Sequence, residues 1–217
     1  MKTHSSRRKK YVFQPVNVGN IVEAGEDVKQ GACPDQAGES DHCGDAAVMA
    51  DRITEALKGS DMVLTTGGVS AGDFDHIPKV MEEIGARLLF HRLPFKPGGA
   101  MFVAVKDGKV ILGLSGNPEA AAIGLLRVGL PYMKKLCGRT DIAFLEAEAV
   151  LAEAFPKPSK GARLLRGQAQ ILDGKLVFHL MDNQKNGAVS SMLDCNLLGE
   201  IPAGSAGISA GTKLRVF

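Results

Sequence analysis

The stretch DMVLTTGGVSAGDFD, from Asp61 to Asp75, decides the fold of this chain. Its first part is an apolar run typical of a buried strand, and its second part is a loop of glycines, hydroxyls and two carboxylates. In α/β proteins the ligand binds just outside the carboxyl ends of the strands, where glycine lets the backbone approach an anion. The stretch therefore predicts a sheet strand that ends at a phosphate or metal site.

The sequence on both sides of this strand predicts an α/β domain over residues 45–138. Apolar side chains recur with helical spacing before the strand, and β-type runs alternate with turn residues after it. Asp107-Gly108 is a dipeptide typical of tight hairpins. The predicted elements are a helix over 45–58, the strand over 61–66, a helix over 77–85, strands over 87–95, 100–105 and 109–114, and a helix from Asn117 to about Leu136.

Two further parts flank this domain. Residues 139–217 contain short alternating segments separated by turns, which predict a small all-β barrel. Residues 1–44 begin with a basic tail, continue with a short extended segment, and end in a run rich in Gly, Asp, Ser and Pro that is typical of a linker. We therefore expect the domain boundaries at residues 44 and 138.

Composition excludes several functional classes. The formal net charge of the 217 residues is +2, and much of the positive excess lies in the first ten residues, so no basic face for nucleic acid is predicted. The four cysteines lack CxxC spacing, and no apolar run reaches the ~18 residues of a membrane span. The N-terminus has no apolar segment of the secretory type. We expect a cytoplasmic protein with reduced thiols and no membrane partner.

The glycine loop offers two kinds of ligand group. Thr66, Gly67, Gly68 and Ser70 would present hydroxyls and backbone N–H groups to an anion, although a glycine pair is also common in turns that only end a strand. Asp73 and Asp75 are two residues apart, so in an extended loop both carboxylates face one side and could hold a divalent cation. Asp75 is equally well placed to cap the following helix.

The start of the long helix is a second candidate site. Gly116, Asn117 and Pro118 combine a flexible residue, an N-cap and a first-turn proline, so that free N–H groups point outward and favour an anion. Capping alone explains this pattern equally well. Glu119 is stabilising as an acid in the first turn, but its charge opposes an anion.

Cations follow two of the predicted strands. Arg92 and Lys96 are four residues apart, so in an extended segment they point to one side, and Pro97 begins a rigid turn after them. Solvated surface positions are the alternative. In the β domain Arg166 could bind an oxyanion, but most arginines on strands face water. Ser190 and Ser191 lie in a polar loop.

Together these motifs strongly resemble the molybdopterin molybdenumtransferase family, the MoeA-like proteins related to the gephyrin E domain. A weaker resemblance links GNIVEAGEDVKQG (19–31) to the family's N-terminal module, and the chain is similar to a member that is shortened at its N-terminus and internally. The motifs are DMVLTTGGVSAGDFD (61–75), FHRLPFKPGG (90–99), GLSGNPEAA (113–121), KKLCG (134–138), GAVSSMLDCNLLGEIPAG (187–204) and AGTKLRVF (210–217).

The resemblance implies a three-layer molybdopterin-binding domain of the MogA type followed by a β-barrel domain. It implies insertion of molybdenum from molybdate into adenylylated molybdopterin, with Mg²⁺-dependent cleavage of the adenylate and a homodimer. Asp73, Asp75 and Lys96 would form the catalytic set, and both aspartates would hold Mg²⁺. The substrate-binding residues implied are Thr66, Gly67, Gly68, Ser70, Arg92, Pro97, Gly116, Asn117, Pro118, Arg166, Ser190 and Ser191.

Two other readings remain open. A non-catalytic module of the gephyrin type would keep the pterin site as a binding or scaffold surface. The related adenylyltransferase branch shares the TTGG loop, but there the loop does not usually continue into GDFD, and that branch lacks the β tail.

Overall fold

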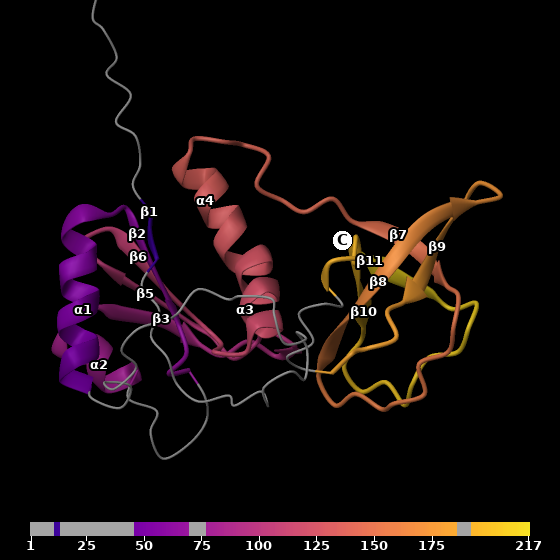
Figure 1. Cartoon of the computed structure of the whole chain (residues 1–217), viewed down its shortest axis with the longest axis horizontal. Coiled ribbons are helices and arrows are strands. Elements are labelled where there is room, and N and C mark those ends of the chain that lie inside the picture. Colours follow the sequence, from indigo (N-terminus) through magenta and orange to yellow (C-terminus); the bar gives the residue numbers. More distant parts are fainter. Residues whose placement is uncertain (1–10, 14–45, 70–76, 186–191) are drawn as a thin grey trace, which may run out of the picture. The chain divides into compact units, whose positions relative to one another are not determined.

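The computed structural model describes residues 11–13, 46–69, 77–185 and 192–217 (Figure 1). These residues divide into two compact units. Those up to Arg92, together with Met101–Gly116, form the first unit. Leu93–Ala100 and the residues from Asn117 onward form the second. Each unit has a sheet of its own.

The first unit is built on a mixed five-stranded sheet. β1, β2 and β6 run parallel, whereas β5 is antiparallel to both of its neighbours, β6 and β3. The carboxyl ends of β2, β6 and β3 therefore lie at one edge. In spatial order the strands are β1 (Tyr11–Phe13), β2 (Met62–Thr66), β6 (Lys109–Leu114), β5 (Phe102–Lys106) and β3 (Arg87–His91).

Two amphipathic helices pack on this sheet, as the apolar spacing predicts. α1 (Ala46–Gly59) buries Ala50, Ile53, Ala56 and Leu57, which recur on one helical face. α2 (Ile77–Glu83) packs against α1 and is contacted by β3. Asp107 and Gly108 have φ angles of 50° and 74°, the left-handed values that a two-residue hairpin turn needs. The predicted helices, the central strand and the hairpin are thus present.

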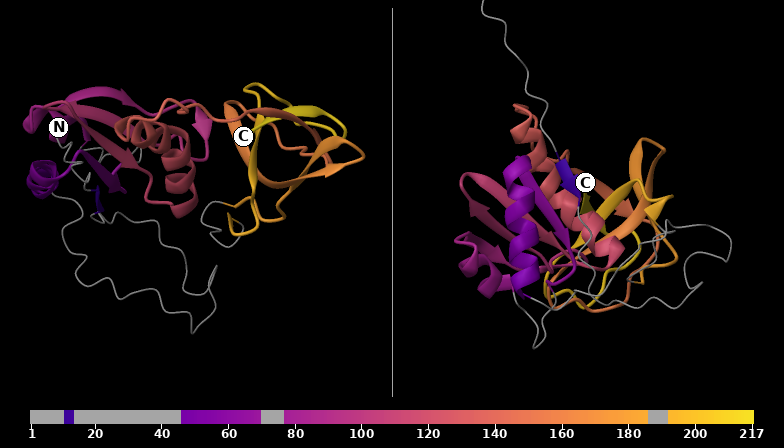
Figure 2. Two further views of the ribbon diagram at one scale, coloured as in Figure 1. Left: turned by 90° about the horizontal axis from the view of Figure 1, so that it is seen from above. Right: turned by 60° about the vertical axis from the view of Figure 1, so that its left-hand side comes forward.

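The second unit contains a closed five-stranded barrel (Figure 2). β8 pairs antiparallel with β9 on one side and with β10 on the other, which closes the order β10-β11-β7-β9-β8. β4 (Phe95–Lys96) adds two residues beside the start of β8. The barrel strands are β7 (Ala147–Leu151), β8 (Ala162–Leu172), β9 (Lys175–Leu180), β10 (Leu197–Ile201) and β11 (Lys213–Val216). The predicted combination of an α/β part with a small β-barrel is confirmed.

The barrel core is centred on Phe178, which is fully buried together with Leu151, Ile201 and Val216. Its ring fits only because two neighbouring strands carry glycine. A Cβ on Gly167 would lie 2.3 Å from the Cζ atom of Phe178. Glycine in a strand interior often marks such a close approach.

The predicted long helix is continuous but changes its winding. α3 (Pro118–Gly124) passes into a π-helical turn, η1 (Leu125–Gly129), and then into α4 (Leu130–Leu136). Pro131 has no N–H and its ring excludes the carbonyl four residues earlier, so a regular turn cannot form there. The N–H of Leu130 instead donates to the carbonyl of Leu125, five residues back. No helix in the described part of the chain is long and apolar enough to span a bilayer.

Candidate oxyanion-binding site

The first unit brings the glycine turn and Gly116 together at the carboxyl edge of its sheet. Thr66, the last residue of β2, pairs with Leu114 of β6, and the N–H of Gly67 donates to the Leu114 carbonyl at 2.9 Å. Gly67 and Gly68 have φ angles of 88° and 70°, which only glycine adopts without strain. Gly116 follows β6 just beyond this edge. The predicted strand-terminal glycine turn is therefore present.

Arg92 lies at the same edge but farther along it. It follows β3 with a φ of 72°, and its N–H donates to the carbonyl of Met101 at 2.7 Å. Three strand spacings separate β3 from β2, or roughly 14 Å. Arg92 and the glycine turn therefore lie at the same edge of the sheet but are not neighbours.

Arg92 and Lys96 do not project from one extended segment, as their spacing predicted. The left-handed backbone at Arg92 ends β3, and Lys96 belongs to β4 in the second unit. The prediction that both cations point to one side was wrong, because the chain changes direction at Arg92. Spacing alone does not reveal such a change.

In the second unit, Lys96 and Pro97 begin a loop that packs against α3. Lys96 pairs with Arg163 of β8, and the N–H of Leu93 donates to the carbonyl of Gly99 at 2.8 Å. A Cβ on Gly98 would lie 3.0 Å from the backbone nitrogen of Gly124, so only glycine allows this contact. The loop is thereby fixed beside the helix.

Asn117 and Pro118 start α3 as predicted. The Asn117 side chain accepts a hydrogen bond from the N–H of Ala120 at 3.1 Å, and Pro118 occupies the first turn. Asn117 therefore has the capping role that its position predicts. This role is compatible with ligand binding but does not require it.

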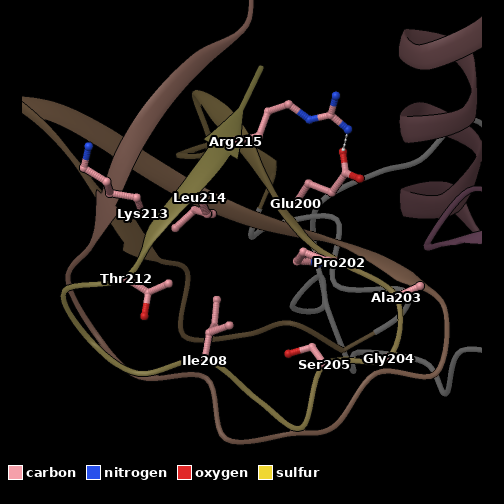
Figure 3. Close-up of a pocket in the computed structure, with 10 residues that line it drawn as sticks. All are labelled: Glu200, Pro202, Ala203, Gly204, Ser205, Ile208, Thr212, Lys213, Leu214 and Arg215. Atoms are coloured by element: carbon pink, nitrogen blue, oxygen red, sulfur yellow. Dashed lines mark hydrogen bonds and ion pairs between the residues drawn. The ribbon is translucent and has the colours of Figure 1, made fainter.

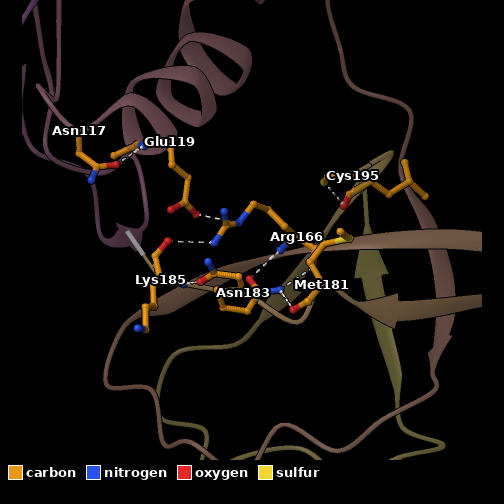
Figure 4. Close-up of polar contacts among 10 residues, drawn as sticks. Asn117, Glu119, Arg166, Met181, Asn183, Lys185 and Cys195 are labelled. Carbon is orange, nitrogen blue, oxygen red and sulfur yellow. Dashed lines mark hydrogen bonds and ion pairs between the residues drawn. The ribbon is translucent and has the colours of Figure 1, made fainter. Parts of the chain in front are cut away.

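Arg166 is the most deeply buried charged residue among those described, with a relative exposure of 0%. It lies on the face of β8 that carries Leu164, and Leu164 packs with Ile123 of α3. Its Nε lies 2.9 Å from Oε1 of Glu119, which is itself 2% exposed, and its Nη2 donates to the Lys185 carbonyl at 3.3 Å (Figure 4). Arg166 does not face water, which was the alternative for a strand arginine.

Gln184 fixes the backbone of Arg166. Its Nε2 donates to the Arg166 carbonyl at 2.7 Å and to the Met181 carbonyl at 2.9 Å, while its Oε1 accepts from the Arg166 N–H at 3.2 Å. This role could not be predicted from sequence, because a single glutamine in a polar loop has no pattern. The structure therefore adds Gln184 and Glu119 to the candidate site.

The environment of Arg166 changes the acid–base behaviour of its neighbours. Burial raises the pKa of the Glu119 carboxyl above its usual range, and the Arg166 guanidinium opposes that rise. Burial also raises the pKa of the Cys195 thiol, whose Sγ donates to the Leu197 carbonyl at 3.2 Å. These shifts mark a region poorly accessible to water.

A cavity of about 290 Å³ reaches this region within the second unit. Arg166, Cys195 and Asn196 line it on the barrel side, and Ile123 and Arg127 line it on the helix side. The Arg127 guanidinium lies 3.9 Å from the ring centre of Phe217, which also lines the cavity. The cavity therefore combines apolar walls with cationic groups.

A second, larger hollow of about 430 Å³ contains none of the predicted site residues. It is lined by Glu200, Lys213 and Arg215 with the loop between β10 and β11 (Figure 3). Arg215 pairs with Glu200 there, at 2.5 Å. Lys213 is paired with Glu148 as well, so both cations already have carboxylate partners and we do not assign the hollow a ligand.

Several predicted residues lie outside the described part of the chain. These are Ser70, Asp73, Asp75, Ser190 and Ser191. Among the described residues, no three His, Cys, Asp or Glu side chains are grouped to hold a metal ion. The donor chemistry of Asp73 and Asp75, two carboxylates, suits a hard cation such as Mg²⁺.

The described site residues thus favour recognition of an oxyanion. Phosphate and molybdate are tetrahedral anions, and arginine is the side chain best suited to bind such oxygens through two parallel N–H groups. Arg92 supplies this group in the first unit, and Lys96 and Arg166 supply cations in the second.

Comparison with known proteins agrees with this chemistry. Residues 38–135 match the model of a probable molybdopterin binding domain, and residues 148–217 match the MoeA C-terminal region, domain IV. The two models together cover most of the chain: the first spans the sheet of the first unit and continues through α3 and α4, and the second spans the β-barrel. The chain is thus a molybdopterin-binding domain followed by a MoeA-type β-barrel, and the predicted fold class is confirmed.

Individual relatives identify the family. The molybdopterin molybdenumtransferase of Staphylococcus aureus (strain Mu50) is 35% identical over 165 residues, which are 76% of this chain and 39% of that protein. That of Bacillus subtilis (strain 168) is 34% identical over 76% of this chain and 38% of its own length. The chain belongs to the family of MoeA-like molybdopterin molybdenumtransferases, and it spans about two fifths of the length of these curated relatives.

Solved structures agree on the fold. The molybdopterin biosynthesis MoeA protein of Pyrococcus horikoshii superposes with a TM-score of 0.62 at 23% identity, over 79% of this chain and 40% of that one. A molybdenum cofactor biosynthesis protein from Pyrococcus furiosus has a TM-score of 0.56 at 21% identity.

Proposed function

We propose that this chain acts in molybdenum cofactor biosynthesis, inserting molybdate-derived molybdenum into adenylylated molybdopterin with cleavage of the adenylate. The names and the 35% identity of the curated relatives support the reaction class. The observation that carries the proposal is that one unit holds two cations on paired strands: Lys96 of β4 lies beside β8, and Arg166 of β8 is buried against Glu119 of α3. Such cations are what an oxyanion substrate needs.

Each group of residues has its own proposed role. At the carboxyl edge of the first sheet, Thr66, Gly67 and Gly68 would receive a phosphate through hydroxyl and backbone N–H groups, and Arg92 would bind a further anionic oxygen. In the second unit, Lys96 and Arg166 would hold the oxygens of molybdate or of the pterin phosphate. Electrostatic positioning, and not a protein nucleophile, would lower the barrier.

Asp73 and Asp75 are the residues that we propose for Mg²⁺. When bound, the ion would supply charge neutralisation at the phosphoanhydride that is cleaved. Lys96 would stabilise negative charge that develops on the same oxyanion, because an ammonium is a compact point charge.

We also propose a cytoplasmic homodimer. The two described cysteines, Cys137 and Cys195, are thiols and form no disulfide, as expected in a reducing compartment. Leu145 and Leu193 expose 95% and 83% of their surface, and covering such side chains favours association. The molar mass of the purified chain by light scattering tests this point.

The reaction is tested with the purified full chain, adenylylated molybdopterin, molybdate and Mg²⁺. We expect AMP release that requires molybdate, is lost in Lys96→Met, and persists in the matched control Lys175→Met, whose side chain is exposed on β9. Asp75→Ala should abolish AMP release, and added Mg²⁺ should not restore it. An unchanged rate in Asp75→Ala contradicts the metal assignment.

Two results overturn the proposed reaction. Tight molybdopterin binding without AMP release identifies a binding or scaffold module instead of an enzyme. If the folded chain neither binds molybdopterin nor releases AMP, both the enzyme and the scaffold interpretation are refuted.

A further inference from the structure

Glu119 holds the guanidinium that the proposed function assigns to the substrate. Its Oε1 lies 2.9 Å from Nε of Arg166, in a region where both side chains are removed from water. Its other oxygen, Oε2, is also buried and accepts no hydrogen bond from any residue that the structure describes. A carboxylate with an unused buried oxygen is poorly stabilised.

A carboxylate and a tetrahedral oxyanion use the same donors. An arginine offers five N–H groups in one plane, and carboxylate or phosphate oxygens bind them in the same bidentate geometry. In Arg166 one of these donors faces Glu119 and another is given to the Lys185 carbonyl. An oxyanion that reaches Arg166 would therefore meet a negative charge already in place.

We propose that Glu119 is an internal competitor for the substrate oxyanion at Arg166, so that oxyanion binding requires the Glu119–Arg166 ion pair to separate. This inference rests on the proposed function, in which Arg166 binds an oxyanion. Glu119 is a positioning residue here, since it acts through Arg166. The 290 Å³ cavity that reaches Arg166 provides space beside the pair.

Protonation of Glu119 would release Arg166 at low cost. The proton comes from solvent and stays on the carboxyl group, so binding of the oxyanion is coupled to proton uptake. The upward shift of the Glu119 pKa through burial brings this step closer to neutral pH.

Among the residues that the structure describes, few other charged groups face Glu119 from the elements around it. Arg166 on β8 and the Cys195 thiol before β10 interact with it electrostatically. On β4, Lys96 lies beside Arg163 in the β-ladder. On the helix itself, Arg127 lies over the Phe217 ring. Among the described residues, Glu119 is therefore the carboxylate that sets the charge at Arg166.

Sulfate binding to the purified full chain tests the inference without pterin or turnover, because sulfate keeps its charge from pH 5 to 8. We expect wild type to bind sulfate more tightly as the pH falls from 7 to 5. Glu119→Gln should bind at least about tenfold more tightly at pH 7 and lose that part of the pH dependence. Arg166→Gln should lose the added affinity. Glu148→Gln, which removes an exposed carboxylate on β7, should match wild type.

A second measurement needs no variant. The carboxyl ¹³C resonance of Glu119 in wild type is titrated with and without sulfate, and sulfate should raise the pKa of Glu119, since coupling between two ligands is reciprocal. An unchanged Glu119 titration, or equal sulfate affinity in wild type and Glu119→Gln, overturns the inference. Failure of AMP release with tighter sulfate binding in Glu119→Gln would refute the proposed reaction alone. AMP release with equal sulfate affinity would refute this inference alone.

Discussion

The second unit contains two Glu–cation pairs that differ in almost every physical respect. Glu119 and Arg166 lie 2.9 Å apart with side-chain exposures of 2% and 0%. Glu148 and Lys213 lie 2.5 Å apart with exposures of 61% and 68%. Water screens the attraction within the exposed pair, whereas burial deprives both charges of the Glu119–Arg166 pair of their solvation. The same charge pairing therefore contributes differently to stability at the two places.

The difference between the two pairs comes from what packs against the barrel strands, since both pairs include residues on these strands. β7 and β11 turn their polar face to solvent, where Glu148, Lys213 and Arg215 form a solvated surface. β8 turns Arg166 toward α3, which begins with the Glu119 turn and continues with the buried Ile123. A strand arginine becomes a candidate functional group only when another element excludes water from it.

Truncating the buried pair has the largest expected effect. Arg166→Ala leaves the Glu119 carboxylate buried without its cation and should lower the free energy of unfolding by about 3–5 kcal/mol. The loss should grow as the pH rises, because a protonated Glu119 carboxyl does not need the cation and burial raises its pKa. Urea unfolding followed by circular dichroism measures it, and hydrogen exchange of the β8 amides assigns it to the second unit.

The control for this truncation is the double variant Glu119→Leu with Arg166→Met. Replacing both charges by apolar side chains of similar size should recover most of the lost stability. If Arg166→Ala costs less than about 1 kcal/mol, the pair is solvated like the exposed one and the contrast between them disappears.

The pH dependence of stability gives a smaller effect of defined sign. Burial holds the pKa of folded Glu119 above its ordinary value near 4.5, the value expected in the unfolded chain. The stability contributed by protonated Glu119 is fully present below the unfolded pKa and is lost as the pH rises through the folded pKa. Wild type should therefore gain stability relative to Glu119→Gln as the pH falls from 7 toward 4.5. A difference that stays constant over this window contradicts the assignment.

The local parts of the fold were predictable from sequence. Apolar spacing located α1, the buried strand β2 and the Asp107-Gly108 hairpin, because each depends on neighbours within a few residues. β10 has no comparable local signal, since LLGEI is short and its Gly199 serves a long-range contact with Phe178. The π turn at η1 was missed because one proline does not specify how a helix absorbs it.

The candidate site was predictable only in part. The glycine turn and the Asn117 cap are local features, and the structure contains both. The partner of Arg166 could not be predicted, because Glu119 and Arg166 are far apart in sequence and meet only through packing of α3 on the barrel. From its charge and position, Glu119 was predicted only to stabilise the first turn of the helix.

The Asn117 cap gives an effect of intermediate size. Asn117→Ala removes the acceptor of the Ala120 N–H and should cost about 1 kcal/mol, while Asn117→Asp should retain most of the stability. Because Glu119 lies two residues farther along, fraying of this turn should also loosen the buried pair. Hydrogen exchange at Ala120 and the Glu119 carboxyl resonance report the two effects separately. An unaltered Glu119 resonance in Asn117→Ala would show that the pair is held by the barrel alone.

The exposed pair should give the smallest effect and completes the comparison. Lys213→Met removes the ammonium next to Glu148 but leaves the aliphatic part of the side chain on β11. We expect a thermal midpoint within experimental error of wild type, because ion pairs in water exchange one set of polar contacts for another. Added salt should change the midpoints of wild type and Lys213→Met alike, since screening has little left to remove. A clear loss in Lys213→Met that salt abolishes would mean that the β7–β11 charges act as a network, and burial would then not be the property that separates the two pairs.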